Sequence, residues 1–508
     1  MLDHKNNSLN NDAIVIGSGI SGLTSAALLA KKGCKVVILE KNRKPGGALR
    51  RFKRQGVPFD VGFHYTGGLG PGEILNVLWE YIGVLPRLTT QQFPAEGCDC
   101  VTIKETDKTV RCFFSYERLK DELQRKFPEE ATGIAGYLET LKDICKDIPF
   151  YNLDIPITPF LRGHIAPMGR GFAEALGSFT RDPALHAVLS LPAFLHGVPP
   201  ANVSIGIHAM VAHGYYSGAY AVDNGGQGIV DAFIPVLEKY GVEIKTGCAA
   251  EEILINNNAV AGVKTREGEL LSSNVIFTGH PTSLLDIVPH EIFRPIFVTR
   301  LKELKNTGSM FAVFGMLNDA VNTNELCWEN YYNIAKGFDS LTVDRNNPAD
   351  SSLMLTAPGM RDTDADLSGA SKSVILMRPA DWSETEQFQL NGKKTRSYAY
   401  ANWKEQATQQ MISKAKTAWG AIGDITPLAA GSPLTFQDEL GAPEGSVYGV
   451  LHSMDQFITG ARTRLPGLYL SGQSTLMNGV MGSSLAGFVT AGEILGLEKL
   501  WDEVRTCR

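Results

Sequence analysis

One stretch near the N-terminus constrains the fold more than any other part of this 508-residue chain. The apolar residues 12–16 (DAIVI) are followed by the glycine-rich segment Gly17–Gly22 (GSGISG) and then by small and apolar residues that Gly33 ends. A second apolar run, Lys35–Leu39, leads directly to Glu40. This order and these lengths predict a strand, a helix and a second strand, which is the repeating unit of a parallel sheet.

The glycines of this unit have separable roles. Gly17 permits the tight turn after the strand, Gly19 lets the backbone approach a pyrophosphate, and Gly22 lets the helix pack on the strand. Ile20 and Ser21 lie in the first helical turn, whose free N–H groups attract phosphate. A lone G-x-G-x-x-G is weak evidence in a chain with 52 glycines, but here it follows a strand, opens a helix and precedes an acid about 20 residues later. The unit therefore predicts a dinucleotide site.

Glu40 is the acid at the end of the second predicted strand. Its carboxylate would accept hydrogen bonds from ribose hydroxyls and would repel a 2′-phosphate, which argues against NADP. The alternative is a solvated acid at the end of a strand.

A second glycine turn follows at once. It contains Lys41, Lys44, Gly46, Gly47 and Ala48, and it leads to the segment VPFDVGFHY, which ends in His64 and Tyr65. Lys44 either adds positive charge near phosphates or is an ordinary solvated turn residue.

These segments together resemble the FAD-binding start of the flavoprotein family that includes amine oxidases, phytoene desaturases, carotenoid isomerases and retinol saturase. A middle segment is similar too: a Gly-Gly helix from Ile229 to Tyr240 precedes a run, 242–255, that pairs with 260–265. In that family this segment lies along the adenine, and Ala250 stands here where valine is usual. A strand that returns toward the cofactor then ends at Gly279.

The last resemblance lies between residues 468 and 495. A short strand is followed by a turn, and a helix then begins near two glycines. In the family, the N-terminus of this helix points at the flavin. The family would place these residues against FAD: Gly472, Gln473, Gly479, Val480, Met481 and Gly482. Gln473 departs from the acid that many members carry, but an amide still hydrogen-bonds ribityl hydroxyls.

The resemblance implies an α/β fold in two parts. A discontinuous Rossmann-like FAD-binding domain would comprise residues 1–72, 216–300 and 441–508. An inserted mixed α+β substrate domain would comprise residues 73–215 and 301–440, with amphipathic helices expected over 116–127 and 133–147.

Composition excludes several classes of function. A net charge of −6 gives no basic field for nucleic acid. The first dozen residues lack the pattern of a secretory signal, so a cytoplasmic protein is expected. The eight cysteines are scattered, and Cys98 with Cys100 cannot complete a tetrahedral site, so no metal is expected. No apolar run is long enough to span a bilayer, although peripheral membrane contact stays open for a protein with an apolar substrate.

The resemblance also implies the reaction. The retinol saturase and carotenoid isomerase branch uses FAD to saturate, desaturate or isomerise carbon-carbon double bonds of polyenes and isoprenoids such as retinoids and carotenoids. Only one dinucleotide fingerprint is visible, so a separate electron donor or acceptor is needed. His64 and Tyr65 are the candidates for proton delivery, although His64 could equally be structural.

Two alternatives remain at this stage. One is a flavin-dependent isomerase or reductase of unsaturated fatty acids. The other is a prenyl-lipid carrier of the GDP-dissociation-inhibitor type, which shares the fold without flavin, but Glu40, Gly46 and the turn at Gly479 would have no use in it. The substrate, the direction of reaction, the electron partner and the oligomeric state are not predicted.

Overall fold

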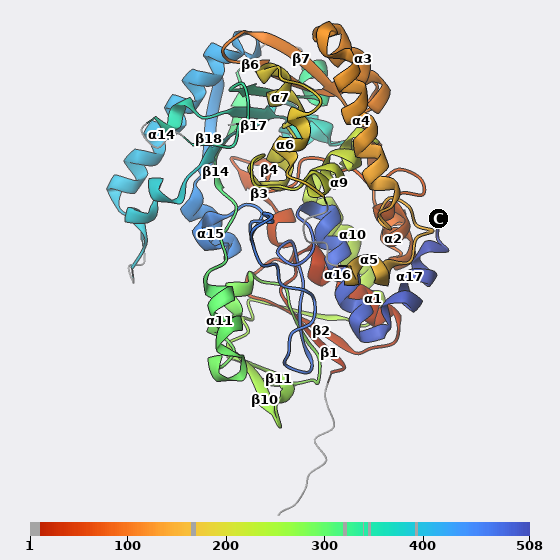
Figure 1. Ribbon diagram of the computed structural model, residues 1–508. Coiled ribbons are helices and arrows are strands. Elements are labelled where there is room, and N and C mark those ends of the chain that lie inside the picture. Colours follow the sequence, from red (N-terminus) through yellow and green to blue (C-terminus); the bar gives the residue numbers. More distant parts are fainter. Residues whose placement is uncertain (1–10, 164–168, 319–322, 339, 344–346, 392–394) are drawn as a thin grey trace, which may run out of the picture.

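The computed structural model describes residues 11–163, 169–318, 323–338, 340–343, 347–391 and 395–508. Residues 1–10, which carry most of the segment tested above for a secretory signal, lie outside the described residues. In Figure 1 a half containing β1 and β2 lies below a half containing β6, β14 and β17.

A five-stranded parallel sheet forms the core of the first half. Its strands stand in the order β19-β13-β1-β2-β9, and each neighbouring pair is parallel. Parallel sheets are covered on both faces, which explains the nearly continuous apolar runs seen in the sequence. The strands are β1 (Ala13–Ile16), β2 (Val36–Glu40), β9 (Glu243–Thr246), β13 (Val275–Phe277) and β19 (Leu468–Leu470).

Helices α1 (Ile20–Lys31) and α16 (Gly479–Leu495) pack side by side against this sheet. They approach so closely that a Cβ on Gly487 would lie 2.5 Å from the carbonyl oxygen of Ser21. The hydroxyl of Ser21 also lies 2.5 Å from that of Ser471, just after β19. Small residues therefore join helix α1, near the beginning of the chain, to β19 and α16.

Helix α10 (Gly225–Lys239) begins four residues before the predicted start at Ile229. Its first residue has φ +52°, and a Cβ there would lie 2.1 Å from the Asp60 carboxylate, so only glycine fits. The glycine pair is thus part of the helix rather than a turn before it.

The prediction of one paired strand over 242–255 is wrong in its first half. Residues 243–246 form β9 and join the parallel sheet beside β2, where the N–H of Cys248 donates to the carbonyl of Glu40 at 2.9 Å. Only β10 (Glu252–Asn256) pairs with β11 (Ala259–Thr265), and β12 (Gly268–Leu271) completes that small antiparallel sheet.

A seven-stranded mixed sheet forms the core of the second half, in the order β18-β14-β17-β16-β15-β6-β7. Within it β6 and β15 are parallel, and the other neighbours are antiparallel. The strands are β6 (Cys98–Ile103), β7 (Lys108–Phe113), β14 (Ser309–Leu317), β15 (Glu329–Ile334), β16 (Leu353–Thr356), β17 (Ser373–Ala380) and β18 (Ile425–Gly431).

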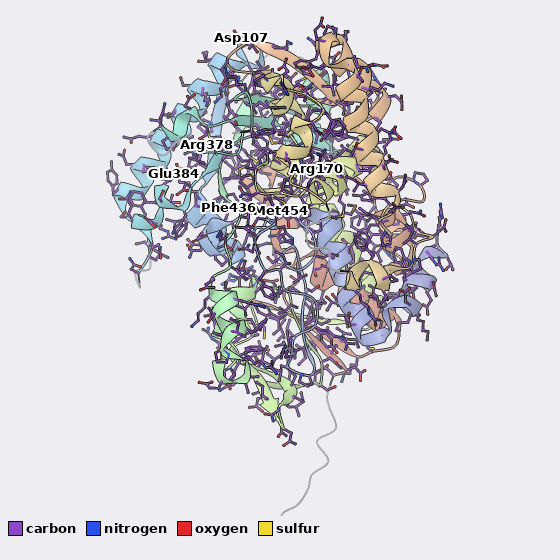
Figure 2. All side chains as sticks on the ribbon, in the orientation of Figure 1. Asp107, Arg170, Arg378, Glu384, Phe436 and Met454 are labelled. Carbon is purple, nitrogen blue, oxygen red and sulfur yellow. The ribbon has the colours of Figure 1, made fainter. Side chains whose placement is uncertain are left out.

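Helices cover both sides of this mixed sheet. Helix α14 (Tyr398–Ala418) packs its apolar residues on one face. Near that side, Arg378 of β17 and Glu384 form a buried ion pair at 2.6 Å, while Asp107 lies at the tip of the hairpin between β6 and β7 (Figure 2). Helices α3 (Tyr116–Lys126), α4 (Ala131–Lys146) and α9 (Ile205–Tyr216) gather on the other side (Figure 1).

The remaining elements are short and connect the two halves or cover their edges. They are β3 (Arg51–Arg54), β4 (Val57–Asp60), β5 (Thr90–Gln92), β8 (Tyr220–Val222), α2 (Ile74–Ile82), α5 (Ile157–Arg162), α6 (Phe172–Gly177), α7 (Pro183–Leu189), α8 (Ala193–His196), α11 (Pro295–Lys302), α12 (Thr323–Trp328), α13 (Ala365–Ser368), α15 (Pro433–Leu440) and α17 (Leu497–Arg505).

The predicted fold class, a Rossmann-like α/β half with a mixed α+β half, is confirmed. The predicted domain boundaries stay a prediction. None of the helices in the described ranges has both the length and the apolar character needed to cross a bilayer.

Candidate functional site

The carboxyl ends of the parallel strands define one edge of the first half. Strand β1 lies between β2, which follows it directly in the chain, and β13, which comes much later. The connections from β1 therefore diverge at this point, and in open α/β sheets ligands bind outside the carboxyl ends of strands at such a place. Gly17, Glu40, Thr278 and Ser471 are the residues at or just after those ends.

Two helix N-termini lie at or beyond this edge. Gly19 is the N-cap of α1. In α16 the hydroxyl of Thr490 donates to the carbonyl of Leu470, at the edge of the sheet. The helix begins at Gly479, eleven residues earlier, which is about 16 Å along the helix axis at 1.5 Å per residue. The edge is thus bounded by two positive helix ends at different heights, which suits an elongated anionic ligand.

The predicted glycines divide into two kinds. A Cβ on Gly17 would lie 2.2 Å from Thr278 Oγ1, and one on Gly22 would lie 2.1 Å from the Gly17 carbonyl oxygen, so these two glycines serve the fold. A Cβ on Gly19 or on Gly479 would meet no atom within 4 Å. The fold does not require glycine at Gly19, whose φ is −64°, whereas the φ of +76° at Gly479 favours glycine by itself. The open space beside both positions fits a ligand that approaches the backbone.

The two glycine turns near the N-terminus come together. The N–H of Gly46 donates to the carbonyl of Ser18 at 3.1 Å, and a Cβ on Gly47 would lie 3.3 Å from Gly19 Cα. Segments about 28 residues apart in the chain therefore make one surface. Lys41, Lys44 and Ala48 are exposed beside it.

Glu40 is buried at the end of β2, with 5% of its surface exposed. Its carboxylate accepts from the N–H and hydroxyl of Ser18, at 3.1 and 2.5 Å, and from the N–H of Asn42 at 2.8 Å. Ala250 is half-buried in the loop after β9, close to this strand end. The acid is held in place by the same loop that carries Gly17 and Gly19, rather than solvated at a strand end.

The C-terminal segment completes the edge. A Cβ on Gly472 would approach the Thr278 carbonyl oxygen at 3.3 Å, and one on Gly482 would lie 2.2 Å from the Met477 carbonyl oxygen. The backbone carbonyl of Gln473 accepts from His452 Nε2 at 2.9 Å, and Gly279 is exposed after β13. Ile20 and Ser21 are buried in the first turn of α1, and Val480 and Met481 are half-buried in that of α16.

Asn478 caps α16 and was not predicted as a site residue. Its Nδ2 donates to the carbonyl of His196 at 2.6 Å, whereas its Oδ1 is enclosed without a hydrogen-bond partner among the described residues. An enclosed acceptor of this kind is costly unless a ligand or water satisfies it. It adds an acceptor at the N-terminus of α16.

The two predicted catalytic residues lie in different environments. His64 is half-buried, its Nδ1 is enclosed without a partner among the described residues, and its carbonyl accepts from Arg361 Nη1 at 3.1 Å. Burial lowers the pKa of His64 to about 4; Asp60 opposes this shift, and Arg361 and Arg51 add to it. The imidazole is therefore neutral at pH 7.

Tyr65 points into an aromatic cluster of Phe93, Phe114 and Tyr215, with ring centroids 5.3 to 5.5 Å away. Its hydroxyl donates to Asp99 Oδ1 across 3.4 Å. Burial raises the pKa of Tyr65 well above its ordinary value, so the phenol stays protonated.

Asp99, on β6, was not predicted as a site residue. It is 5% exposed and accepts from Asn330 Nδ2 at 2.8 Å. Burial raises the pKa of Asp99 to about 7, although Asn330 and Tyr65 pull it down. A carboxyl group that still holds its proton near neutral pH is a candidate acid or base.

The buried cation Arg361 completes this cluster. Its Nη2 donates to Asn330 Oδ1 at 3.2 Å, and the hydroxyl of Thr356 donates to the same oxygen at 2.6 Å. No local motif marks Asp99 or Arg361. Their association depends on the register of β6 with β15, which sets Asp99 opposite Asn330.

A second buried charge cluster fixes the position of α10. The Arg51 guanidinium lies between Asp60 at 2.7 Å and Asp362 at 2.5 Å, all three nearly inaccessible. Asp60 also accepts from the N–H of Gly226 at 3.1 Å, and Asp362 from that of Asn224 at 3.0 Å. Burial alone would lower the pKa of Arg51, but the two carboxylates raise it above its ordinary value.

A family model described as an NAD(P)-binding Rossmann-like domain matches residues 15–82. All-trans-retinol 13,14-reductase of Danio rerio is 27% identical over 95% of this chain and 86% of its own length. Hydroxyneurosporene desaturase of Rubrivivax gelatinosus is 24% identical over 91% and 88%. Chloroplastic prolycopene isomerase of Daucus carota is 28% identical over 52% of this chain and 45% of its own.

Solved structures share the fold at lower identity. An oxidoreductase from Methanosarcina mazei aligns with a TM-score of 0.66 and 15% identity, covering 94% of this chain and 99% of its own. A putrescine oxidase double mutant gives 0.60 and 15% over 96% and 99%. A Rab GDI from Plasmodium falciparum gives 0.53 and 12% over 96% and 98%.

The whole chain therefore folds like these proteins, and its sequence relatives converge on one group. It shares its fold with the Methanosarcina oxidoreductase, putrescine oxidase and Rab GDI, and it is similar in sequence to all-trans-retinol 13,14-reductase, hydroxyneurosporene desaturase and prolycopene isomerase.

Proposed function

We propose that this protein is an FAD-dependent oxidoreductase that acts on carbon-carbon double bonds of a long apolar polyene, such as a retinoid or a carotenoid. The observation that carries the proposal is the similarity to all-trans-retinol 13,14-reductase over 95% of the chain. Because the relatives that align over nearly the whole chain include all-trans-retinol 13,14-reductase and hydroxyneurosporene desaturase, we expect hydrogen transfer rather than isomerisation alone.

The dinucleotide edge supports FAD as the cofactor. Gly19, Gly46 and Gly47 would lie along the pyrophosphate and Glu40 at the adenosine ribose, while the N-terminus of α16 would face the far end of the molecule, near Gly479 and Asn478. The height difference between the two helix ends suits a dinucleotide that extends past the sheet. Bound FAD would supply hydride transfer to or from a substrate carbon.

The pair of Tyr65 and Asp99 is our candidate for moving the proton. The buried Asp99 carboxyl, whose pKa lies near 7, can hold a proton at neutral pH, and the hydroxyl of Tyr65 links it to the aromatic cluster. His64, whose pKa lies near 4, is neutral and can offer an N–H but no cation. Aromatic and apolar side chains around Tyr65 suit a polyene and exclude water.

The other classes of function are less well supported. Rab GDI matches in fold at 12% identity, whereas the relatives found by sequence are named as enzymes of retinol and carotenoids. The prenyl carrier and the enzyme of unsaturated fatty acids are therefore not favoured. We further propose a cytoplasmic location with peripheral membrane contact, from which an apolar substrate would be drawn, and a separate protein as electron donor or acceptor.

The test is an anaerobic incubation of the FAD-loaded protein, oxidised in one series and reduced with dithionite in another, with all-trans-retinol, phytoene and oleic acid. We expect the reduced protein to add two hydrogens to a polyene, seen by product mass, while its flavin absorbance returns. Loss of two hydrogens in the oxidised series would assign the desaturase direction. Unchanged mass and chromatography with every polyene, in a protein that retains FAD, would refute the proposal.

A further inference from the structure

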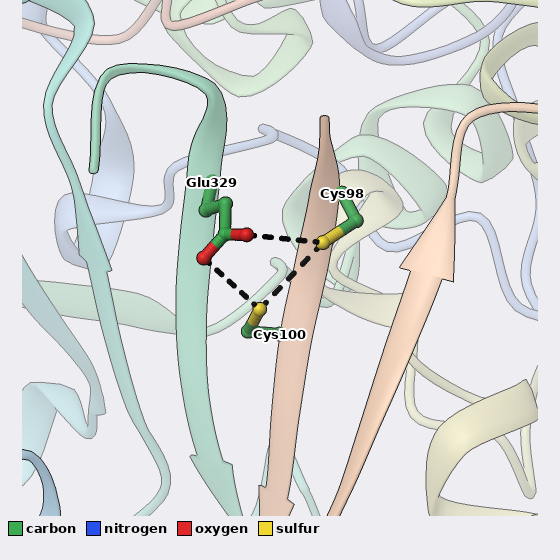
Figure 3. Close-up of side chains that lie close together, drawn as sticks. All are labelled: Cys98, Cys100 and Glu329. Atoms are coloured by element: carbon green, nitrogen blue, oxygen red, sulfur yellow. Dashed lines mark hydrogen bonds between the residues drawn. The ribbon is translucent and has the colours of Figure 1, made fainter. Parts of the chain in front are cut away.

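Strand β6 carries Cys98 and Cys100, two residues apart, so both side chains project from the same face. Their sulfur atoms are 3.6 Å apart. Figure 3 shows the third member of the cluster, Glu329, on the neighbouring strand β15, where it stands opposite Cys98 in the register. Its Oε2 lies 3.4 Å from Cys100 Sγ and its Oε1 lies 4.0 Å from Cys98 Sγ.

The sulfur–sulfur separation matches one edge of a tetrahedral coordination sphere, and one carboxylate oxygen of Glu329 lies within 4.8 Å of both sulfur atoms. Two thiolates bound to one Zn²⁺ at about 2.3 Å lie about 3.8 Å apart, and a carboxylate oxygen at about 2.0 Å lies about 3.5 Å from each sulfur. All three side chains are nearly or fully buried. They are therefore preorganised, and an ion would need only small shifts of the ligand atoms.

The surrounding charges balance a dication. Two thiolates and one carboxylate with Zn²⁺ carry a net charge of −1, and the Arg111 guanidinium neutralises it, with Nη2 2.5 Å from Glu329 Oε1 and Nε 3.4 Å from Cys98 Sγ. The hydroxyl of Tyr331 donates to Glu329 Oε2 at 2.7 Å. Such outer hydrogen bonds orient metal ligands in known sites.

We infer that Cys98, Cys100 and Glu329 form a zinc site with a fourth position for water or another small ligand. The sequence alone argued against a metal here because two cysteines cannot complete a site. The third ligand comes from a residue 231 positions later, which only the pairing of β6 with β15 brings into reach.

Thiolates with one carboxylate favour Zn²⁺ over Mg²⁺ or Ca²⁺, which prefer oxygen ligands alone. Binding would release the thiol protons of Cys98 and Cys100 to solvent and form two Zn–S bonds and one Zn–O bond, with no change of oxidation state. Because these two protons are lost on binding, zinc affinity should increase as the pH rises.

An ion at this place would join two distant parts of the chain. The pair β6 and β15 is parallel and brings the segment before residue 104 against the segment after residue 328. A ligand on each strand would hold that junction, so Zn²⁺ should stabilise the folded state by mass action.

The test uses the flavin-containing protein, reduced and anaerobic. One equivalent of Zn²⁺ is added, excess metal is removed by dialysis, and bound zinc is measured by elemental analysis. We expect close to one zinc per chain in the wild type and in Cys34→Ser, a half-buried cysteine in the other half of the molecule. The double variant Cys98→Ser, Cys100→Ser should retain almost none, and Glu329→Gln should bind more weakly.

A second measurement needs no variant. At a urea concentration at which iodoacetamide reaches Cys98 and Cys100 of the metal-free wild type, Zn²⁺ should slow their alkylation, mapped by peptide mass, more than that of Cys34. Absence of zinc from the dialysed wild type, equal zinc in the double variant, or unchanged alkylation of Cys98 and Cys100 at that urea concentration would each overturn the inference. None of these readouts depends on the proposed reaction.

Discussion

At the scale of single residues, Gly19 is the position where the proposed cofactor binding can be tested apart from folding. Its φ of −64° and ψ of 170° are accessible to any residue, and a Cβ there meets no protein atom within 4 Å. We expect Gly19→Ala to lower the affinity for FAD by roughly tenfold or more, because the methyl group would occupy the approach to the pyrophosphate.

The measurement is FAD affinity by fluorescence titration, with thermal unfolding of the apoprotein alongside. Gly177→Ala is the matched control, since that glycine is also open but lies in α6. The unfolding midpoint should hardly change in either variant. Wild-type FAD affinity in Gly19→Ala would show that the edge is not the cofactor site.

Asp99 makes stability depend on pH with a definite sign. Burial raises the pKa of Asp99 from 3.8 to about 7, so between those values the folded protein keeps a proton that the unfolded chain has lost. The contribution is fully present below pH 4 and is lost as the pH rises through 7, by up to roughly 4 kcal/mol at about 1.4 kcal/mol per pKa unit.

The comparison that isolates this contribution is urea unfolding of wild type and Asp99→Asn at pH 5 and at pH 8. The stability of the wild type relative to Asp99→Asn should be lower at pH 8 than at pH 5. Buried histidines such as His64 change stability in both proteins alike and cancel in the difference. A difference that is constant or grows with pH would contradict a raised pKa.

At the scale of elements, the Arg51 cluster ties β3 and β4 to the start of α10. Arg51→Met would leave Asp60 and Asp362 buried without their cation, which typically costs about 3–5 kcal/mol. We expect a corresponding loss in the free energy of unfolding by urea. Arg266→Met, in an exposed pair with Glu251, should change it by less than about 1 kcal/mol, and equal losses in both variants would remove the cluster from this role.

Helices and strands are predicted best from the sequence where local residue chemistry determines them. Gly17, Gly19 and the apolar strand after them specify β1, α1 and β2 within a residue or so. The split of 242–255 into β9 and β10 was missed because the local pattern of β9 (EIKT) does not show which sheet it joins, and only the free edge of β2 decides that. Asp99, Arg361 and Glu329 were missed as site residues because they act through strand register, which no local pattern records.

At the scale of the whole molecule, each half is assembled from distant segments. The parallel sheet takes strands from residues 13–40, 243–246, 275–277 and 468–470, and the mixed sheet pairs 98–103 with 329–334. Resemblance to a family predicted this overall plan, since single-sequence patterns do not reveal which segments meet. The predicted fold class is correct, whereas the association of Tyr65 with Asp99 and of His64 with Arg361 is seen only in the folded structure.

The place of β19 in the sheet has a consequence for how the protein is made. A ribosome makes β19 and α16 after every other strand of both sheets, so the side of α1 that packs on α16 and the edge of β13 that pairs with β19 stay uncovered until residues 468–495 are made. The same late segment supplies Gly472 and the helix that opens at Gly479. The proposed cofactor site is therefore complete only after residue 482 has been made, and the nascent chain before that point is the species that most needs protection from aggregation.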